Sequence, residues 1–167
     1  MEVSGLLRIR VHRGINLAVR DKRGTSDPYA VVKSGLQKVR SKVLRDTLNP
    51  VWEDDLTIHI KDLNLPVILT VYDKDTFTDD DNMGHAQLDI KPLFECTRMG
   101  LEDLYDGTTV EKIEPSPDNC LAEQSRVVWT DGKMSQEMKL KLRNVETGEV
   151  EIRIEWTDLP GDVGIHI

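Results

Sequence analysis

The 167-residue chain lacks an excess of basic residues, because 22 Lys and Arg stand against 30 Asp and Glu, for a net charge of -8. A general nucleic-acid binder needs a basic excess to displace the counterions of the phosphate backbone. The same deficit argues against simple electrostatic adsorption to anionic lipid. We therefore expect no nucleic-acid partner, and any membrane role must depend on a local basic patch, a bridging cation, or both.

The chain is also poor in cysteine and in long apolar runs. Its two cysteines, Cys96 and Cys120, are too few for a disulfide framework, so we expect two buried free thiols in a reducing compartment. No apolar run approaches the ~20 residues that span a bilayer. Residues 1–4 lack the basic and apolar regions of a secretory signal, and the chain shows no myristoylation or prenylation motif. These absences predict a cytoplasmic protein.

Most of the chain alternates between apolar and polar residues, which is the period-2 signature of half-buried strands. In residues 150–156 the even positions are apolar and the odd positions are charged. Turn signals separate such segments, and Asp131-Gly132 suits a tight hairpin because both residues tolerate positive φ. The pattern predicts an all-β fold, a β-sandwich of about eight strands formed by residues 1–167 as one domain. The other expected strands are 7–12, 28–32, 37–44, 52–60, 67–72, 86–90 and 137–143.

Residues 91–126 break this rhythm. They combine a weak helical candidate at 92–104 with a loop rich in Pro, Asp and Asn at 115–119. A connection of this length in a compact domain is usually functional or disordered. We predict a partly helical insertion here, and we expect it to provide the surface that a specific protein partner contacts.

Two clusters of aspartate each follow a predicted strand. The first contains Asp21 and Asp27, and the second contains Asp73, Asp75 and the run 79–81. Carboxylates within ~5 Å of each other repel by about 3 kcal/mol per pair at an effective dielectric constant near 20. A fold that brings five of them together needs a compensating cation. Ca²⁺ suits such a site, because it takes six to eight hard oxygen ligands in a flexible geometry.

Other interpretations of the aspartates fit less well. Solvated acidic turn residues would explain one cluster better than two at matching strand ends. An EF-hand fails on spacing, because the twelfth position counted from Asp73 is Gly84 and that from Asp79 is Ile90. Paired-carboxylate catalysis is poorly matched by five carboxylates. The sequence contains no Gly-rich phosphate loop or nucleophile motif, so we do not expect an enzyme.

Four motifs follow one another at set spacings. They are Asp21-x5-Asp27-Pro28-Tyr29, Asn49-Pro50-Val51-Trp52, Val71-Tyr72-Asp73-x-Asp75-x5-Asp81 and Met83-Gly84. Their order and spacing resemble the C2 domain. The resemblance implies an eight-stranded antiparallel sandwich with calcium-binding loops at one end. It also implies type II topology, in which the final strand, 149–156, takes the place that an N-terminal strand fills in other C2 domains.

The same resemblance implies a set of calcium ligands. The backbone carbonyls of Arg20 and Lys74 are expected to join the carboxylates, and Thr78 and Asp79 are further candidates. Whether Asp79, Asp80 or Asp81 completes the cage stays open. The carboxylates implied by the motif are those of Asp21, Asp27, Asp73, Asp75 and Asp81.

Two surfaces are candidates for contact with an anionic phospholipid membrane. Lys22 and Phe77 lie where the loop tips of the family lie. The Phe77 ring either inserts into the headgroup boundary or packs back under its own loop. The second surface is a basic strand face on which basic residues contribute about 1 kcal/mol each near anionic lipid, unless the face is merely solvated. It consists of Lys38, Arg40 and Lys42, with Lys33 nearby.

Three further features are the insertion at 91–126, the run 119–123 within it and the ending at 156–161. With these features the chain, over nearly its full length, also resembles the small plant single-C2 proteins of the C2-domain abscisic-acid-related family. The resemblance implies calcium-dependent phospholipid binding and recruitment of abscisic acid receptors to the plasma membrane.

Two alternatives remain. Some relatives are described as GTPase activators, so a regulator whose partner is a GTPase is the first. A calcium-independent scaffold with vestigial aspartates is the second. The expected location is the cytoplasm, peripheral at the plasma membrane when calcium is bound, with the nucleus as an alternative.

Overall fold

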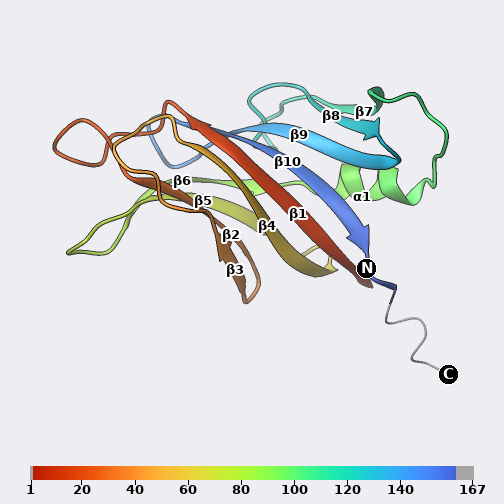
Figure 1. Ribbon diagram of the computed structural model, residues 1–167, viewed down its shortest axis with the longest axis horizontal. Coiled ribbons are helices and arrows are strands. Elements are labelled where there is room, and N and C mark those ends of the chain that lie inside the picture. Colours follow the sequence, from red (N-terminus) through yellow and green to blue (C-terminus); the bar gives the residue numbers. More distant parts are fainter. Residues whose placement is uncertain (1, 161–167) are drawn as a thin grey trace.

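The computed structural model describes residues 2–160, which form two antiparallel β-sheets and one short helix (Figure 1). Residue 161, the last position of the sequence motif at 156–161, lies outside the described residues. The elements are β1 (Glu2–Ile15), β2 (Pro28–Ser34), β3 (Gln37–Arg40), β4 (Val51–Asp62), β5 (Val67–Asp73), β6 (Asp81–Leu88), α1 (Lys91–Arg98), β7 (Thr108–Ile113), β8 (Ser125–Thr130), β9 (Lys133–Lys141) and β10 (Glu149–Asp158).

The strands divide into a six-stranded sheet, in the order β4-β1-β10-β9-β8-β7, and a four-stranded sheet, in the order β3-β2-β5-β6. In the larger sheet β1 pairs with β4 on one side and with β10 on the other, where Ile9 lies opposite Ile154. The final strand thus lies beside the first. This arrangement confirms the antiparallel sandwich and the position predicted for the last strand in the type II topology.

The described residues contain ten strands, two more than the eight predicted. The additional strands are β7, inside the 91–126 insertion, and β8, which begins at its border. All residues of β7 except Lys112 are half-buried, so no alternation of apolar and polar residues marks it in the sequence. Antiparallel pairing with β8 stabilises this strand, which the local sequence pattern does not indicate.

The helix of the insertion is shorter than the predicted span 92–104. Pro92 occupies its first turn, where the missing backbone N–H costs no hydrogen bond. Phe94 packs edge-on against Trp156 of β10, with ring centroids 5.2 Å apart. The helix ends before Gly100, whose φ of 62° is a left-handed conformation that terminates many helices.

The hairpin predicted at Asp131-Gly132 joins β8 to β9. Both residues have positive φ, 54° for Asp131 and 77° for Gly132. Thr130 pairs directly with Lys133 across this two-residue turn. Such a turn matches the right-handed twist of the flanking strands, which is why Asp-Gly is favoured in it.

Both cysteines are buried free thiols, as expected. Burial and, after it, a hydrogen bond from its Sγ to Glu111, 3.3 Å long, raise the pKa of Cys96 to about 11. The thiol is therefore protonated and unreactive at neutral pH. Within residues 2–160 no helix has the length and apolar character needed to cross a bilayer.

Trp52 connects the apolar core between the sheets to the functional end of the molecule. Its side chain is fully buried, and its indole N–H donates to the Pro28 carbonyl over 3.1 Å. This bond ties β4, in one sheet, to the start of β2, in the other. Because Pro28 directly follows Asp27, the core fixes the position of the first aspartate cluster.

Candidate metal centre

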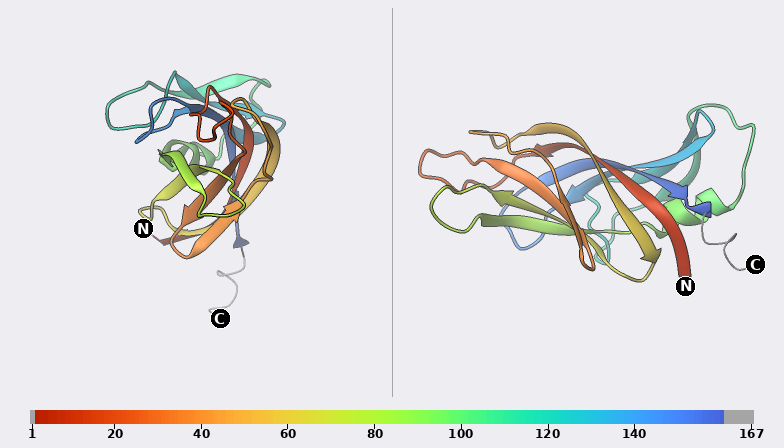
Figure 2. Two further views of the ribbon diagram at one scale, coloured as in Figure 1. Left: turned by 90° about the vertical axis from the view of Figure 1, so that its left-hand side faces the viewer. Right: turned by 60° about the horizontal axis from the view of Figure 1, so that its bottom comes forward.

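Three strand ends of the smaller sheet meet at one end of the molecule. Asp73, the last residue of β5, pairs with Pro28, the first of β2, and with Asp81, the first of β6. The loops 16–27 and 74–80 extend from these strand ends, and Figures 1 and 2 show them together at the end opposite to the N-terminus. The antiparallel sheet therefore brings the two predicted aspartate clusters to one place.

Asp73 lies at the centre of this place. Its side chain is 6% exposed, and its Oδ1 accepts a hydrogen bond from the Asp27 backbone N–H over 2.7 Å. Burial raises the pKa of Asp73, and the charges of Asp27, Asp21 and Asp81 raise it further, against the hydrogen bond from Asp27. The structure thus holds a buried carboxylate in the field of three others.

The first loop is fixed by its own side chains. Asp21 accepts hydrogen bonds from the backbone N–H groups of Arg23, at 2.8 Å, and Thr25, at 3.1 Å, and from the Thr25 hydroxyl. The Thr25 backbone bond is the main reason that the pKa of Asp21 is lowered. The buried Ser26 hydroxyl donates to the Ala18 carbonyl over 2.9 Å. Asp21 is therefore an ionised carboxylate in a fixed position.

Asp46 is a site residue that the sequence analysis missed. Oxygens of Asp21, Asp27 and Asp46 lie within 4.8 Å of one another. Asp46 belongs to the 41–50 loop, and its backbone N–H donates to Asp27 Oδ1 over 2.8 Å. No motif marked it, because a loop outside the two clusters brings it to the site. Its position beside the Asn49-Pro50 turn was the one signal available.

The aspartates of the second cluster, Asp80 and Asp81, have different surroundings. Asp80 Oδ1 accepts a hydrogen bond from the Asp75 backbone N–H over 2.8 Å, and Asp80 Oδ2 accepts one from the Tyr29 hydroxyl. Lys74 Nζ lies 3.7 Å from the same Oδ2. The Asp80 carboxylate is thus engaged in hydrogen bonds that fix the 74–80 loop. The charge of Asp81, in contrast, acts on Asp73.

The remaining predicted ligands lie around the same end. Asp75 Oδ1 accepts a hydrogen bond from the Phe77 backbone N–H over 3.0 Å, and Thr78 and Asp79 are exposed in the loop. Among the described residues, the group of carboxylates within 4.8 Å of one another consists of Asp21, Asp27 and Asp46 and contains none of Asp73, Asp75 and Asp81. The roles of these last three as ligands therefore stay predictions.

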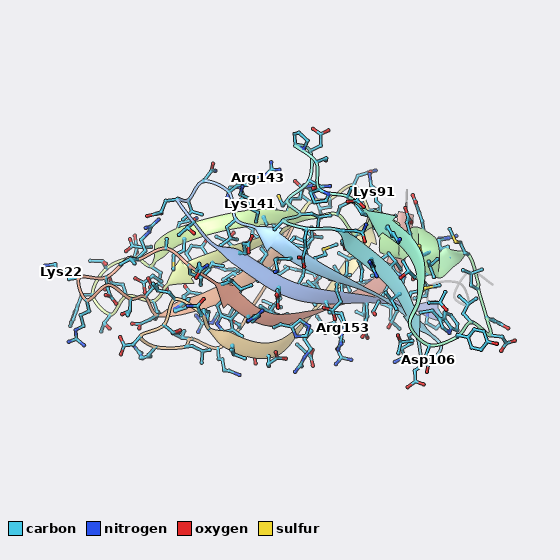
Figure 3. All side chains as sticks on the ribbon, turned by 90° about the horizontal axis from the view of Figure 1, so that it is seen from above. Lys22, Lys91, Asp106, Lys141, Arg143 and Arg153 are labelled. Carbon is cyan, nitrogen blue, oxygen red and sulfur yellow. The ribbon has the colours of Figure 1, made fainter. Side chains whose placement is uncertain are left out.

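The two loop-tip residues project from this end of the molecule. Phe77 is 93% exposed, so its ring does not pack back under the loop. Figure 3 shows Lys22 at the extreme of the loop end and Asp106 at the opposite end. An exposed apolar ring and a basic side chain on loops at one end of the molecule are suited to a membrane interface.

The basic face differs from the prediction in one residue. Lys33 of β2 pairs directly with Lys38 of β3, and Arg40 lies two residues further along the same strand. Lys42 was predicted to continue this face, but β3 ends at Arg40. The Lys42 Nζ instead donates to the Trp52 carbonyl over 2.6 Å. The basic face, as the structure has it, consists of Lys33, Lys38 and Arg40.

Comparison with known proteins identifies the class. A family model for the C2 domain matches residues 5–105, so this is a C2-domain protein. A structure of two C2 domains of extended synaptotagmin 2, solved with calcium bound, aligns with a TM-score of 0.62 and 21% identity. That alignment covers 95% of this chain and 48% of the other, and at this identity it shows the fold alone.

Closer relatives identify the family. The protein C2-domain ABA-related 5 of Arabidopsis thaliana is 56% identical over 157 residues, which cover 94% of this chain and 78% of that protein. A protein named GTPase activating protein 1, from Oryza sativa subsp. indica, is 50% identical over 161 residues, which cover 96% of each chain. The chain belongs to the C2-domain ABA-related family.

The buried charge of Asp73 leads to a stability prediction. In excess chelator, Asp73→Asn should raise the melting temperature by about 2–4 °C, on the order of 1 kcal/mol for a domain of this size. The amide removes a buried charge and its repulsion, while its Oδ1 can still accept from Asp27. Because folding raises the pKa of Asp73, its ionised form destabilises the fold above that pKa. The gain should therefore shrink as the pH falls below the folded-state pKa and vanish below the unfolded-state pKa.

Asp80→Asn is the matched control. Burial acts to raise the pKa of Asp80, but the bonds from Tyr29 and Asp75 and the charge of Lys74 outweigh burial and lower the pKa. Its ionised form therefore stabilises the fold, and Asp80→Asn should lower the melting temperature. Equal losses from Asp73→Asn and Asp80→Asn, measured by thermal unfolding at neutral pH, would contradict this account.

Proposed function

We propose that the protein is a calcium-dependent adaptor that binds anionic phospholipid through its loop end and recruits a protein partner to the membrane. The observation that carries the proposal is the buried Asp73 carboxylate in the field of Asp21, Asp27 and Asp81. Oxygen ligands of this kind fit Ca²⁺, whereas soft metals prefer sulfur or imidazole. The site therefore fits a hard divalent cation.

The proposed ligands come from two loops. Asp21 and Asp27 of the first loop and Asp73, Asp75 and Asp81 of the second would supply carboxylates. The carbonyls of Arg20 and Lys74 would add ligands, and Thr78 and Asp79 are further candidates. Bound calcium would cancel the local negative charge and offer open coordination positions to lipid phosphate. We add Asp46 to this proposed set because its carboxylate lies within 4.8 Å of those of Asp21 and Asp27.

Lys22, Phe77 and the basic face would hold the membrane. Phe77 is exposed at a loop tip whose backbone is fixed by Asp75, so its ring can enter the headgroup region at little entropic cost. Lys33 and Lys38 are like charges directly opposite each other, which is unfavourable in a sheet without a counterion. An anionic headgroup such as that of a phosphoinositide would relieve this repulsion.

The 91–126 insertion is the proposed surface for the protein partner. Met99, Leu101 and Tyr105 are exposed apolar or aromatic side chains within it, a residue type enriched at protein interfaces. The names of the Arabidopsis relatives connect them to abscisic acid, so abscisic acid receptors are the proposed partner class. The proposed location is the cytoplasm, with recruitment to the plasma membrane when calcium is bound and the nucleus as a second compartment.

Liposome co-sedimentation tests the proposal. The protein should pellet with phosphatidylserine vesicles in calcium and stay in the supernatant with excess chelator. The double variant Asp73→Ala, Asp75→Ala should lose calcium-dependent binding by roughly tenfold or more, because ligand charge sets calcium affinity. Asp103→Asn is the control, since this residue lies in the insertion and asparagine tolerates its φ of 57°.

Each other outcome points to a different mechanism. Lipid binding that survives the double substitution unchanged would count against the calcium cage. Equal pelleting with calcium and with chelator would indicate that the basic face, and not the calcium site, binds the lipid. No pelleting in either condition would favour a calcium-independent scaffold or a regulator of a GTPase.

A GTPase-activating regulator is the second candidate, favoured by the name of the rice relative. Such an activator often supplies an arginine in trans. Three arginines in or beside the insertion are engaged within the chain. Arg98 lies over the Phe94 ring, Arg126 donates to Gln124, and Arg143 donates to backbone carbonyls. Because each guanidinium already makes a contact within the chain, none of the three stands out as an arginine to be supplied to a GTPase.

Under the adaptor account, stoichiometric protein should leave the GTP hydrolysis rate of purified candidate GTPases unchanged, as measured by phosphate release. An arginine supplied in trans typically accelerates hydrolysis by about 10³-fold or more. Acceleration of that order, lost on substitution of one of the three arginines, would establish the regulator instead.

A further inference from the structure

The β9–β10 loop (142–148) is anchored on β6. The Arg143 backbone N–H donates to the His85 carbonyl over 2.8 Å, and the His85 N–H donates back over 3.2 Å. Val145 packs over Gly84, where an added Cβ would lie 2.6 Å from Val145 Cγ1. One side of this loop is therefore fixed to the strand that begins with the second aspartate cluster.

The other side of the 142–148 loop contacts the 16–27 loop, which carries the first aspartate cluster. The Arg20 guanidinium donates from Nη1 to Glu146 Oε2 over 3.0 Å and from Nη2 to Glu146 Oε1 over 2.8 Å. Nη1 also donates to the Val19 carbonyl, and the Arg20 backbone N–H donates to the Ser26 hydroxyl. The bidentate contact, together with these bonds, gives the guanidinium a single position.

Arg20 carries a positive charge at the position directly before Asp21 in the first loop. The hydrogen bond to Glu146 is the largest cause that raises the pKa of Arg20. Burial opposes it, and the charges of Asp81 and Asp73 contribute after that of Glu146. A guanidinium released from Glu146 would be attracted to these two carboxylates, which the proposed calcium site requires. It would then act as a competing cation inside the chain.

We propose that Glu146 is a positioning residue that holds Arg20 away from Asp73 and Asp81 and so keeps these carboxylates free for a divalent cation. The proposal rests on the calcium site proposed above. Glu146 acts through Arg20 and not as a ligand, because both of its carboxylate oxygens accept hydrogen bonds from the guanidinium.

Calorimetric calcium titration of four proteins tests this role: wild type, Glu146→Gln, Arg20→Gln and the double variant. Glu146→Gln should weaken calcium binding by about two- to fivefold, the range of a partly exposed ion pair. Arg20→Gln should bind calcium as tightly as wild type or more tightly. In the Arg20→Gln background, Glu146→Gln should have little further effect, because no guanidinium remains to compete.

Two calcium results would overturn the proposal. Glu146→Gln with unchanged affinity would remove the role, and an equal loss in both backgrounds would show that Glu146 acts through its own charge. Glu123→Gln is the matched control, since Glu123 has the same 61% exposure as Glu146 and pairs with Lys139 at 3.8 Å. It should leave calcium affinity unchanged.

The melting temperatures of the same four proteins in excess chelator separate this proposal from the calcium site itself. If wild type binds no calcium, the proposed function fails, but the chelator series still reports whether Glu146 fixes Arg20. Non-additive changes in melting temperature support the contact. Additive changes would overturn it, whatever the affinity for calcium.

Discussion

Mutual repulsion between carboxylates is the constraint around which the loop end is organised. The pairing of β5 with β2 and β6 puts Asp73, of the second aspartate cluster, next to the first cluster, where the charges of its neighbours act on a side chain that has lost most of its water. A fold retains such an arrangement at a cost in stability. The cost is understandable if a divalent cation is the partner for which these carboxylates are kept.

The positive side chains nearby do not remove that constraint. Arg45 lies 3.6 Å from Asp27, Lys74 pairs with Asp80, and Arg20 is held by Glu146. Within residues 2–160 no Lys, Arg or His forms an ion pair with Asp73. The basic residues thus surround the site and leave its centre uncompensated, an arrangement suited to reversible binding of a cation and then of lipid phosphate.

Structural features that depend on neighbouring residues could be predicted from the sequence. Contacts between residues far apart in the chain could not. Strands such as β10 and the Asp131-Gly132 hairpin follow from alternation and turn chemistry, which act between close neighbours. β7 depends on its pairing with β8, and Asp46 reaches the site from a loop outside the aspartate motifs. The contact between Arg20 and Glu146 joins residues 126 positions apart, and no periodicity in either segment could indicate it.

The melting temperature of the wild-type protein over a calcium titration tests the central claim most directly. A ligand that binds the folded state stabilises it by mass action, so the melting temperature should rise with calcium and fall back when chelator is added. Magnesium at the same concentrations should produce a much smaller rise, because it tolerates an irregular cage of carboxylates poorly. A melting temperature that calcium leaves unchanged would contradict the claim that these aspartates are kept together to bind it.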